Sequence, residues 1–260
     1  MQTDRRRTIV ELVQASGSKR VAQLCDLFGV SEMTIRRDLR DLEREGLIRR
    51  VHGGAVVNLG RSFEPPYALR ATRHEARKQA ISRRAAELVL DGDSLALDVG
   101  TTLLELAQAL GGKRNLTILT ASLPIANAIV ARLSLTSDVR LILTGGIVRA
   151  GELSMIGPIP AQTYSNYHVD KAFIGVGGLD LKAGLTEFNV DDAVVKQALI
   201  QNARQRIVLA DSSKIGRTAF AAVAPLAVVN TLVTDDGLPA DQRQALEAAG
   251  IEVLTVPAGD

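Results

Sequence analysis

The chain has 260 residues but only one cysteine, three histidines and no tryptophan. The single cysteine, Cys25, excludes an intramolecular disulfide and any zinc site built from several cysteines, and it fits a reducing cytoplasm. The longest apolar run, residues 220–229, is interrupted by Pro225, whereas a membrane helix needs roughly 20 apolar residues. No apolar stretch follows the basic N-terminus, so we expect no signal peptide. These absences predict a cytoplasmic protein without a metal or cofactor.

Charge is divided unevenly along the chain, although the net charge is only +2. Residues 1–84 hold 18 Lys or Arg against 10 Asp or Glu, and residues 85–260 hold 13 against 19. A basic segment joined to an acidic body favours an anionic partner for the N-terminal part, with nucleic acid first. Arginine-rich helices can also be merely solvated, so the pattern within the segment has to decide.

That pattern predicts a helix-turn-helix. A helix over 21–28 ends at Gly29, which makes a tight turn, and Ser31 is a strong N-cap for the next helix. Ile35, Leu39 and Leu42 form the apolar stripe of this third helix, which ends at Gly46. A helix, a glycine turn and a capped helix at this spacing are typical of DNA-binding proteins, and the third helix takes the recognition position.

A small β-wing follows the recognition helix. The pattern predicts strands over 47–51 and 55–57 joined by a turn at 52–54. The recognition helix presents its basic residues opposite the apolar stripe, while its acidic residues, Asp38 and Asp41 among them, would temper non-specific affinity for phosphates. His52 has no partner nearby that would make it a metal ligand. The candidate DNA-binding residues are Ser31, Thr34, Arg36, Arg37, Arg40, Arg49, Arg50 and His52.

The stretch VSEMTIRRDLRDLEREGLIRRVHGGA resembles the N-terminal winged helix of the DeoR-type bacterial transcription regulators. We therefore divide the chain into a winged helix-turn-helix domain over 1–57, a linker over 58–72 that contains Pro65 and Pro66, and a C-terminal domain over 73–260.

The C-terminal domain alternates apolar strands with helices. This pattern predicts a mainly parallel α/β sheet covered on both faces. Helices are expected near 73–90, 101–110, 123–133, 190–203 and 240–249. Strands are expected at 94–98, 116–120, 139–144, 171–176, 206–210, 228–234 and 251–256.

Polar residues and glycines follow many of these strands, at the edge where open parallel sheets bind ligands. Gly100-Thr101-Thr102 opens a helix and suits a phosphate, and Lys214 would add a positive charge. Asp98, Glu187 and Asp211 could accept hydrogen bonds from sugar hydroxyls. The candidate effector-binding residues are Asp98, Gly100, Thr101, Thr102, Gly145, Gly146, Glu187, Asp211 and Lys214.

These motifs, in this order, also resemble the effector domain of the DeoR-type regulators, a domain similar to ribose-phosphate isomerases. The resemblance implies a repressor of a sugar-catabolic operon that a phosphorylated sugar or related metabolite releases from operator DNA. It also implies a homo-oligomer, a dimer or a tetramer. Two positions depart from the family pattern: Val99 replaces the usual serine and Ala121 the usual asparagine.

Two other functions stay open at this stage. An isomerase-like enzyme fused to a DNA-binding domain could use Glu187 as its base, but Gly175-Val176-Gly177-Gly178 stands where the isomerases carry an Asp-Gly-Ala-Asp motif. We therefore favour a sensor that does not turn over its ligand. A nucleoid-type DNA binder would not respond to a small molecule at all.

Overall fold

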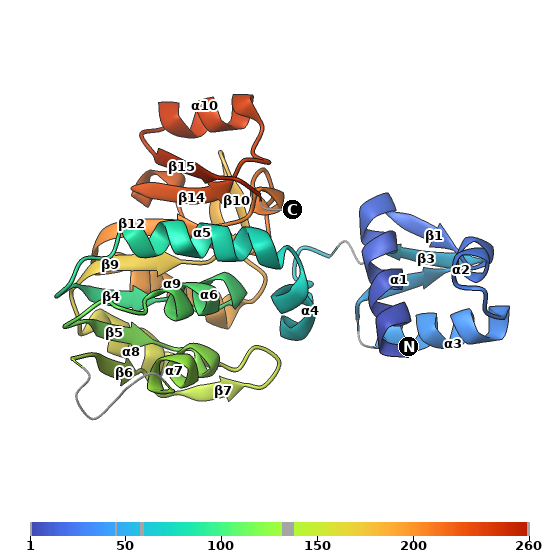
Figure 1. The fold of residues 1–260 in the computed structure, drawn as a ribbon, viewed down its shortest axis with the longest axis horizontal. Helices are drawn as coiled ribbons and strands as arrows, with labels where there is room; N and C mark the ends of the chain where they lie inside the picture. The colour runs from blue at the N-terminus through green and yellow to red at the C-terminus, as the bar shows by residue number, and fades with distance from the viewer. Residues whose placement is uncertain (1, 45, 58–59, 132–137, 259–260) are drawn as a thin grey trace. The chain divides into compact units, whose positions relative to one another are not determined.

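Figure 1 shows the computed structural model, which describes residues 2–44, 46–57, 60–131 and 138–258. The chain forms two compact units, Met1–Leu69 and Arg70–Asp260. The segment expected as a linker, 58–72, contains the helix α4, Tyr67–Thr72; positions 58 and 59 lie outside the described residues. Within the described part of the chain, no helix is both long enough and apolar enough to span a bilayer.

The first unit is a winged helix-turn-helix. Its helices are α1 (Gln2–Ser16), α2 (Val21–Phe28) and α3 (Glu32–Arg44). The expected wing strands are β2 (Ile48–Val51) and β3 (Gly54–Val57), and a further strand, β1 (Ser18–Arg20), pairs with β3 to make a three-stranded antiparallel sheet in the order β1-β3-β2. The strand β1 was not predicted, because its three residues are polar and show no alternation.

The apolar stripes predicted for this unit form its core. Ile35, Leu39 and Leu42 of α3 are buried together with Ile9 and Val13 of α1. Gly29 ends α2 with φ at +62°, in the left-handed region that favours glycine. Gly54 is required for another reason: a Cβ there would lie 2.4 Å from the backbone oxygen of Lys19 in β1.

The second unit is built on a seven-stranded sheet in the order β15-β14-β12-β9-β4-β5-β6, and all of its pairings are parallel. All seven strands expected from the sequence are present. Their bounds are β4 Ser94–Leu97, β5 Thr117–Thr120, β6 Arg140–Leu143, β9 Val169–Ile174, β12 Ala203–Leu209, β14 Thr231–Asp235 and β15 Glu252–Val256.

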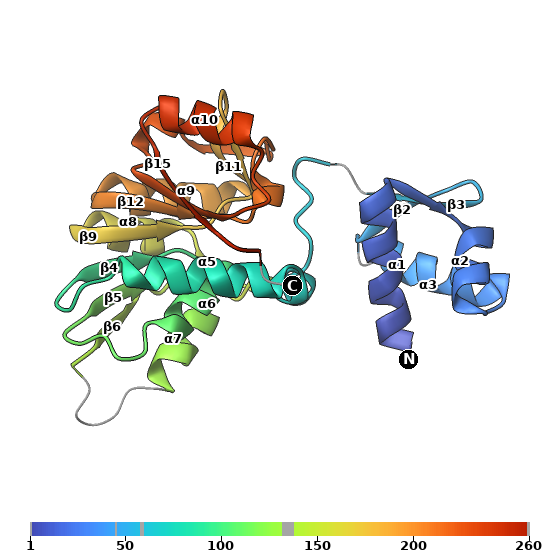
Figure 2. The same ribbon diagram turned by 45° about the horizontal axis from the view of Figure 1, so that its top comes forward.

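Helices cover both faces of this sheet (Figures 1 and 2). On one face lie α5 (Glu75–Glu87), α6 (Thr101–Ala109) and α7 (Leu123–Val130), and on the other α8 (Pro158–Ser165) and α9 (Val190–Gln201). The helix α10 (Ala240–Ala248) packs through Leu246 into the same cluster as α9. The helix expected over 123–133 thus ends at Val130, and positions 132 and 133 lie outside the described residues.

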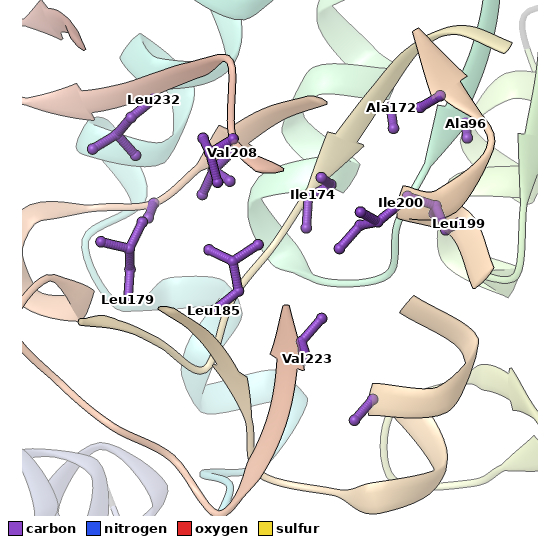
Figure 3. Packing of buried hydrophobic residues seen from close by; sticks show 14 of the residues in the cluster. Ala96, Ala172, Ile174, Leu179, Leu185, Leu199, Ile200, Val208, Val223 and Leu232 are labelled. Carbon is purple, nitrogen blue, oxygen red and sulfur yellow. The ribbon is translucent and has the colours of Figure 1, made fainter. Parts of the chain in front are cut away.

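Alternation along each strand divides the core into two layers. Leu95 and Leu97 of β4 pack with α5, α6 and α7, whereas Ala96 between them packs on the α8 and α9 side. Figure 3 shows part of the second layer, where Leu199 and Ile200 of α9 lie among residues from several strands.

Short elements that the sequence analysis did not predict complete the fold. They have three or four residues each, so no period can develop within them. They are β7 (Ile147–Arg149), β8 (Ser154–Ile156), β10 (Gly178–Asp180), β11 (Gly184–Glu187), β13 (Ala221–Ala224) and the 3₁₀ turns Ser212–Lys214 and Leu226–Val228.

Candidate functional site

The recognition helix α3 is capped and oriented by its own residues. The Ser31 hydroxyl accepts a hydrogen bond from the backbone N–H of Thr34 at 3.3 Å, and the Ser31 carbonyl accepts from the N–H of Ile35. Ser31 therefore acts as the expected N-cap. The buried stripe turns the opposite side of the helix outward, and Met33 on that side is 80% exposed.

The exposed side of α3 carries the predicted arginines. Arg36 is held by Glu32 one turn earlier, with its Nε 2.8 Å from Oε1. Among the described residues, none forms a hydrogen bond or ion pair with the side chain of Arg37 or Arg40. A hollow of about 920 Å³ opens on this side, and its lining residues are Arg5, Glu32, Met33, Thr34, Arg36, Arg37, Asp38 and Arg40.

The wing presents the remaining candidates. Arg49 and Arg50 are exposed on β2, and His52 is exposed in the turn before β3. Arg50 is tied to α3, because Glu43 accepts its backbone N–H at 2.8 Å and lies 3.6 Å from its Nε. This contact fixes the base of the wing against the recognition helix.

Asp38 has a structural role that the sequence did not predict. It is fully buried and accepts hydrogen bonds from Arg5 Nε at 2.7 Å and from Arg6 Nε at 3.0 Å, both on α1. Asp41 is also bonded to Arg6, and these carboxylates raise the pKa of that guanidinium. The two acids therefore join α1 to α3, where their charges pair with those of Arg5 and Arg6. The sequence contained both residue types but no signal that paired them.

In the second unit, the loop between β4 and α6 lies at the carboxyl edge of the sheet. Gly100 precedes α6 with φ at +124°, which only glycine adopts readily. Thr101 is buried and Thr102 half-buried. Two residues of α5 one turn apart contact this loop: Lys78 Nζ lies 3.4 Å from Thr101 Oγ1, and the Ser82 hydroxyl donates to the Thr102 carbonyl at 2.9 Å.

A buried ammonium that the sequence analysis missed organises the neighbouring strand ends. Lys196 of α9 is 2% exposed, and its Nζ lies 2.7 Å from Asp98 Oδ2 and 2.8 Å from Glu187 Oε2. It also donates to the Gly175 carbonyl at 2.6 Å. Asp98 and Glu187, which we expected to bind sugar hydroxyls, are thus brought together by an internal cation. Lys196 lies in the middle of α9, and its sequence neighbours do not distinguish it from a surface lysine. Only the packing of the helix shows that it is buried.

The two carboxyl groups of this triad are not equivalent. Burial raises the pKa of Asp98 despite the neighbouring Lys196 ammonium. Burial also opposes ionisation of Glu187, but the Lys196 ammonium and a hydrogen bond from the Phe188 N–H hold its pKa below the ordinary value. The carboxylates in turn raise the pKa of Lys196. A single ammonium can balance the negative charge of only one carboxylate. Ionisation of the second carboxyl group, Asp98, is therefore opposed by its burial, which raises its pKa.

The segment that follows β12 carries two more predicted effector-binding residues, Asp211 and Lys214, at the carboxyl edge of the sheet. Asp211 is buried and accepts the Ser213 N–H at 3.0 Å. The Lys214 ammonium lies over the ring of Phe188, 5.2 Å from its centroid, and lowers the pKa of the adjacent Glu187. Asp235, at the end of β14, accepts the backbone N–H of Ser212 at 2.7 Å and so fixes this turn.

Gly145 and Gly146 lie on the opposite side of β4 from Asp211 and Lys214. They follow β6, the outermost strand, which β5, β4 and β9 separate from β12. With neighbouring strands about 4.8 Å apart, β6 lies about 19 Å from β12 but about 10 Å from β4, and β12 lies about 10 Å from β4 on the other side. A Cβ on Gly146 would lie 2.7 Å from Pro160 Cδ. The packing of α8 thus explains this glycine without a ligand.

Both units match known protein families. Residues 5–60 match the DeoR-like helix-turn-helix domain, and residues 73–236 match the DeoR C terminal sensor domain. The chain belongs to the DeoR family. It is a DNA-binding transcriptional regulator with an α/β sensor domain, as its sequence predicted.

Curated relatives align over almost the whole DeoR-family chain. The glycerol-3-phosphate regulon repressor of Escherichia coli K12 is 35% identical over 245 residues, covering 94% of this chain and 95% of its own. A putative aga operon transcriptional repressor of Escherichia coli O157:H7 is 33% identical over 256 residues, covering 98% and 94%. The uncharacterised regulator YulB of Bacillus subtilis is 37% identical over 254 residues, covering 98% and 96%. These relatives are named as transcriptional regulators.

Solved structures resemble this chain more remotely. The sorbitol operon regulator SorC of Klebsiella pneumoniae is 14% identical with a TM-score of 0.44, covering 93% of this chain and 98% of its own. Ribose 5-phosphate isomerase of Methanocaldococcus jannaschii is 19% identical with a TM-score of 0.40, covering 55% of each chain.

Both departures from the DeoR pattern replace a polar side chain with an apolar one that packs inward. Ala121 is buried in the core cluster, and Val99 is half-buried against the same cluster. Neither can supply the hydroxyl or amide that the family pattern places there.

Proposed function

We propose that this DeoR-family regulator is a cytoplasmic repressor of a sugar-catabolic operon, released from its operator by a phosphorylated sugar or related metabolite. The observation that carries the proposal is the joining, in one chain, of an exposed recognition helix to a sensor unit with cations and hydrogen-bonding groups at one sheet edge. The names of the aligned glycerol-3-phosphate and aga repressors support it.

On the DNA side, we propose that α3 enters the major groove with Arg37 and Arg40 toward the bases. Thr34 and Arg36 would flank them at the N-terminal end of the helix. Arg49, Arg50 and His52 of the wing would follow the phosphate backbone. Ser31 would contribute mainly by holding the start of the helix. Because a single winged helix binds weakly, we propose that the protein acts as a dimer or tetramer on repeated half-sites.

On the effector side, we propose that the phosphate lies at Gly100-Thr101-Thr102, with Lys214 and Asp211 on the other side of the ligand. The spacing of about 10 Å between β4 and β12 suits a molecule of this size. Asp98 and Glu187 would border the ligand while remaining bound to Lys196. Gly145 and Gly146 stay candidates on the other side of the loop, because β6 lies two strands from β4, as β12 does.

We propose sensing without catalysis. An isomerase needs a carboxylate base with a raised pKa that can reach the substrate. Glu187, the base expected for an isomerase, instead has a lowered pKa and is held by Lys196 and by the Phe188 N–H. Asp98, whose pKa is raised, is buried with its Oδ2 bound to Lys196 and to the Gly175 N–H. A coupled assay that detected isomerisation of a pentose or hexose phosphate, lost in Glu187→Gln, would overturn this part of the proposal.

The test is release of the full-length protein from DNA. Operator sequences would first be selected from random duplexes and labelled for anisotropy measurements. sn-Glycerol 3-phosphate, ribose 5-phosphate and a series of hexose phosphates would then be added in turn. At least one of these compounds should lower the affinity of the protein for its operator. Unchanged binding across the series, together with unchanged melting temperature, would support the nucleoid-type alternative and contradict the proposal.

A further inference from the structure

Lys78 of α5 is a buried cation whose main partners lie outside the proposed effector contacts. Its side chain is buried, and its Nζ donates to the backbone carbonyls of Arg70 and of Ala71, the latter at 2.9 Å. Its third neighbour is the Thr101 hydroxyl at 3.4 Å. A lysine ammonium has three hydrogens, so these three acceptors match its full donor capacity.

The two carbonyls belong to the last turn of α4, where helix carbonyls have no partner within the helix and the helix dipole is negative. An ammonium at this end therefore stabilises the turn. A helix of only six residues depends on such tertiary contacts, because it is too short to be stable alone. The Arg70 side chain is also held, by an ion pair with the buried Glu152. Arg70 is the residue at which the sensor unit begins.

We propose that Lys78 is a positioning residue that couples effector binding to the backbone at the start of the sensor unit. With the effector site empty, its ammonium holds the carbonyls of Arg70 and Ala71; an anionic group bound at Thr101 draws the ammonium away and loosens the end of α4. This coupling rests on the proposed function, because it needs an anion at Thr101.

Electrostatics favours the transfer. An ammonium is attracted to the full charge of an anionic oxygen more strongly than to the dipole of a neutral carbonyl, and the difference grows in a buried site of low dielectric constant. Burial lowers the pKa of Lys78 to about 8, because the neighbouring groups compensate the ammonium charge only in part. The carboxylates of Asp211, Glu105 and Glu75 act on it favourably and the Arg70 guanidinium unfavourably. A phosphate would supply the compensation that these groups leave incomplete.

An effector can shift an equilibrium only through different affinities for two states. Here the two states differ in the partner of the Lys78 ammonium. In one state it donates to the carbonyls of α4, and in the other it donates to the bound anion. Loss of the carbonyl contacts reaches the chain at the residue where the two units meet in sequence, without any change being required in the sheet.

The test is hydrogen exchange of residues 67–72 in the full-length protein, with and without millimolar sn-glycerol 3-phosphate or inorganic phosphate. In the unchanged protein, the probe should speed exchange in this segment about 5- to 150-fold, the range expected for loss of two hydrogen bonds. Lys78→Met should exchange fast without the probe and show no further change. Lys78→Arg, which keeps donors for the carbonyls, should retain slow exchange without the probe.

The matched control is Lys113→Met. Lys113 also donates to a backbone carbonyl, that of Val89 at 2.5 Å, but contacts neither α4 nor Thr101 in the described structure. This variant should respond like the unchanged protein. Thr101→Val should lose the response while keeping slow exchange without the probe, and it serves if Lys78→Met does not fold.

Melting temperature distinguishes the two ways in which the idea could fail. If both probes raise the melting temperature of the unchanged protein but exchange in 67–72 does not rise, or rises equally in Lys78→Met, the coupling is wrong and the effector site stands. If neither probe stabilises the protein nor alters exchange, while operator release also fails for every phosphate ester, the proposed effector site falls and the coupling with it.

Discussion

The two units place their functional side chains in opposite ways. In the winged helix, Arg37 and Arg40 project from the exposed side of a single helix, and the core beneath them consists of apolar residues from the same short segment. In the sensor, the polar groups at the sheet edge are buried and come from distant segments, as Asp98, Glu187 and Lys196 show. A local surface can be read from periodicity, whereas a buried constellation depends on topology.

The largest effect is expected from breaking the sensor's buried triad. Lys196→Met leaves Asp98 and Glu187 buried without their cation, so we expect a loss of about 3–5 kcal/mol in the free energy of unfolding, measured by urea denaturation. The triple variant with Asp98→Asn and Glu187→Gln should recover much of it. Lys182→Met, at an exposed lysine, is the control. A loss below about 1 kcal/mol would show that the triad contributes little to stability.

The corresponding change in the winged helix should cost less. Asp38→Ala removes the carboxylate that joins α1 to α3, and its partners Arg5 and Arg6 can still reach water. We expect about 2–3 kcal/mol from lost charged hydrogen bonds. Asp41→Ala, which removes a more exposed carboxylate, should cost less than 1 kcal/mol. Equal losses in the two variants would remove the distinction between the buried and exposed pairs.

Effector binding can be weakened without unfolding the sensor. Lys214→Ala removes a charge-assisted contact of about 1.5–3 kcal/mol, so affinity for the phosphate ester should fall roughly 10- to 150-fold. Affinity for operator DNA without effector should not change, and the variant should remain on the operator when effector is added. Normal release of labelled operator from this variant would exclude Lys214 from the effector site.

The exposed arginines test the other half of the comparison. Arg37→Ala should cost about 1–3 kcal/mol in operator binding and relax base preference. Arg50→Ala on the wing should weaken binding evenly across sequences and reduce its salt dependence. Neither should alter the melting temperature. If a salt titration gave the two variants the same slope and the same specificity, the proposed division between base and phosphate contacts would be wrong.

The last test concerns the dependence of stability on pH. The pKa of Lys78 is lowered to about 8 in the folded protein, below its ordinary value. The folded state therefore binds fewer protons than the unfolded state between the two values. Its stability should rise with pH above about 8, relative to the Lys78→Met variant. Urea denaturation of both proteins at pH 7 and pH 9.5 measures this difference. A constant difference would show that Lys78 titrates normally.

Much of the architecture could be predicted from the sequence. Ser31, Ile35 and Gly46 are enough to place α3 and its exposed side, because caps and apolar periods act within a few residues. The seven sheet strands were predicted for a similar reason, since continuous apolar runs indicate strands buried on both faces. The paired strand β1 and the short β7, β8, β10, β11 and β13 were not, because three or four residues carry too little pattern.

The candidate site was only partly predictable. Thr101, Asp211 and Lys214 follow predicted strands, so their place at the carboxyl edge could be expected. Their distance from Gly145 could not, because strand order is not written in the strands themselves. Lys78 and Lys196 were missed because a lysine within a helix is usually on the surface, and its sequence neighbours do not reveal what packs against it.

The sequence by itself determined the winged helix, the alternation of strands and helices, and the family to which the chain belongs. These depend on local periods, capping residues and glycine turns. Only the tertiary structure decided that Asp38 joins two helices, that Lys196 gathers two carboxylates, and that Lys78 links α4 to Thr101. Each of these depends on a charge being buried beside a partner from another segment. Burial and proximity are set by the packing of the whole unit, not by the residues on either side in the chain.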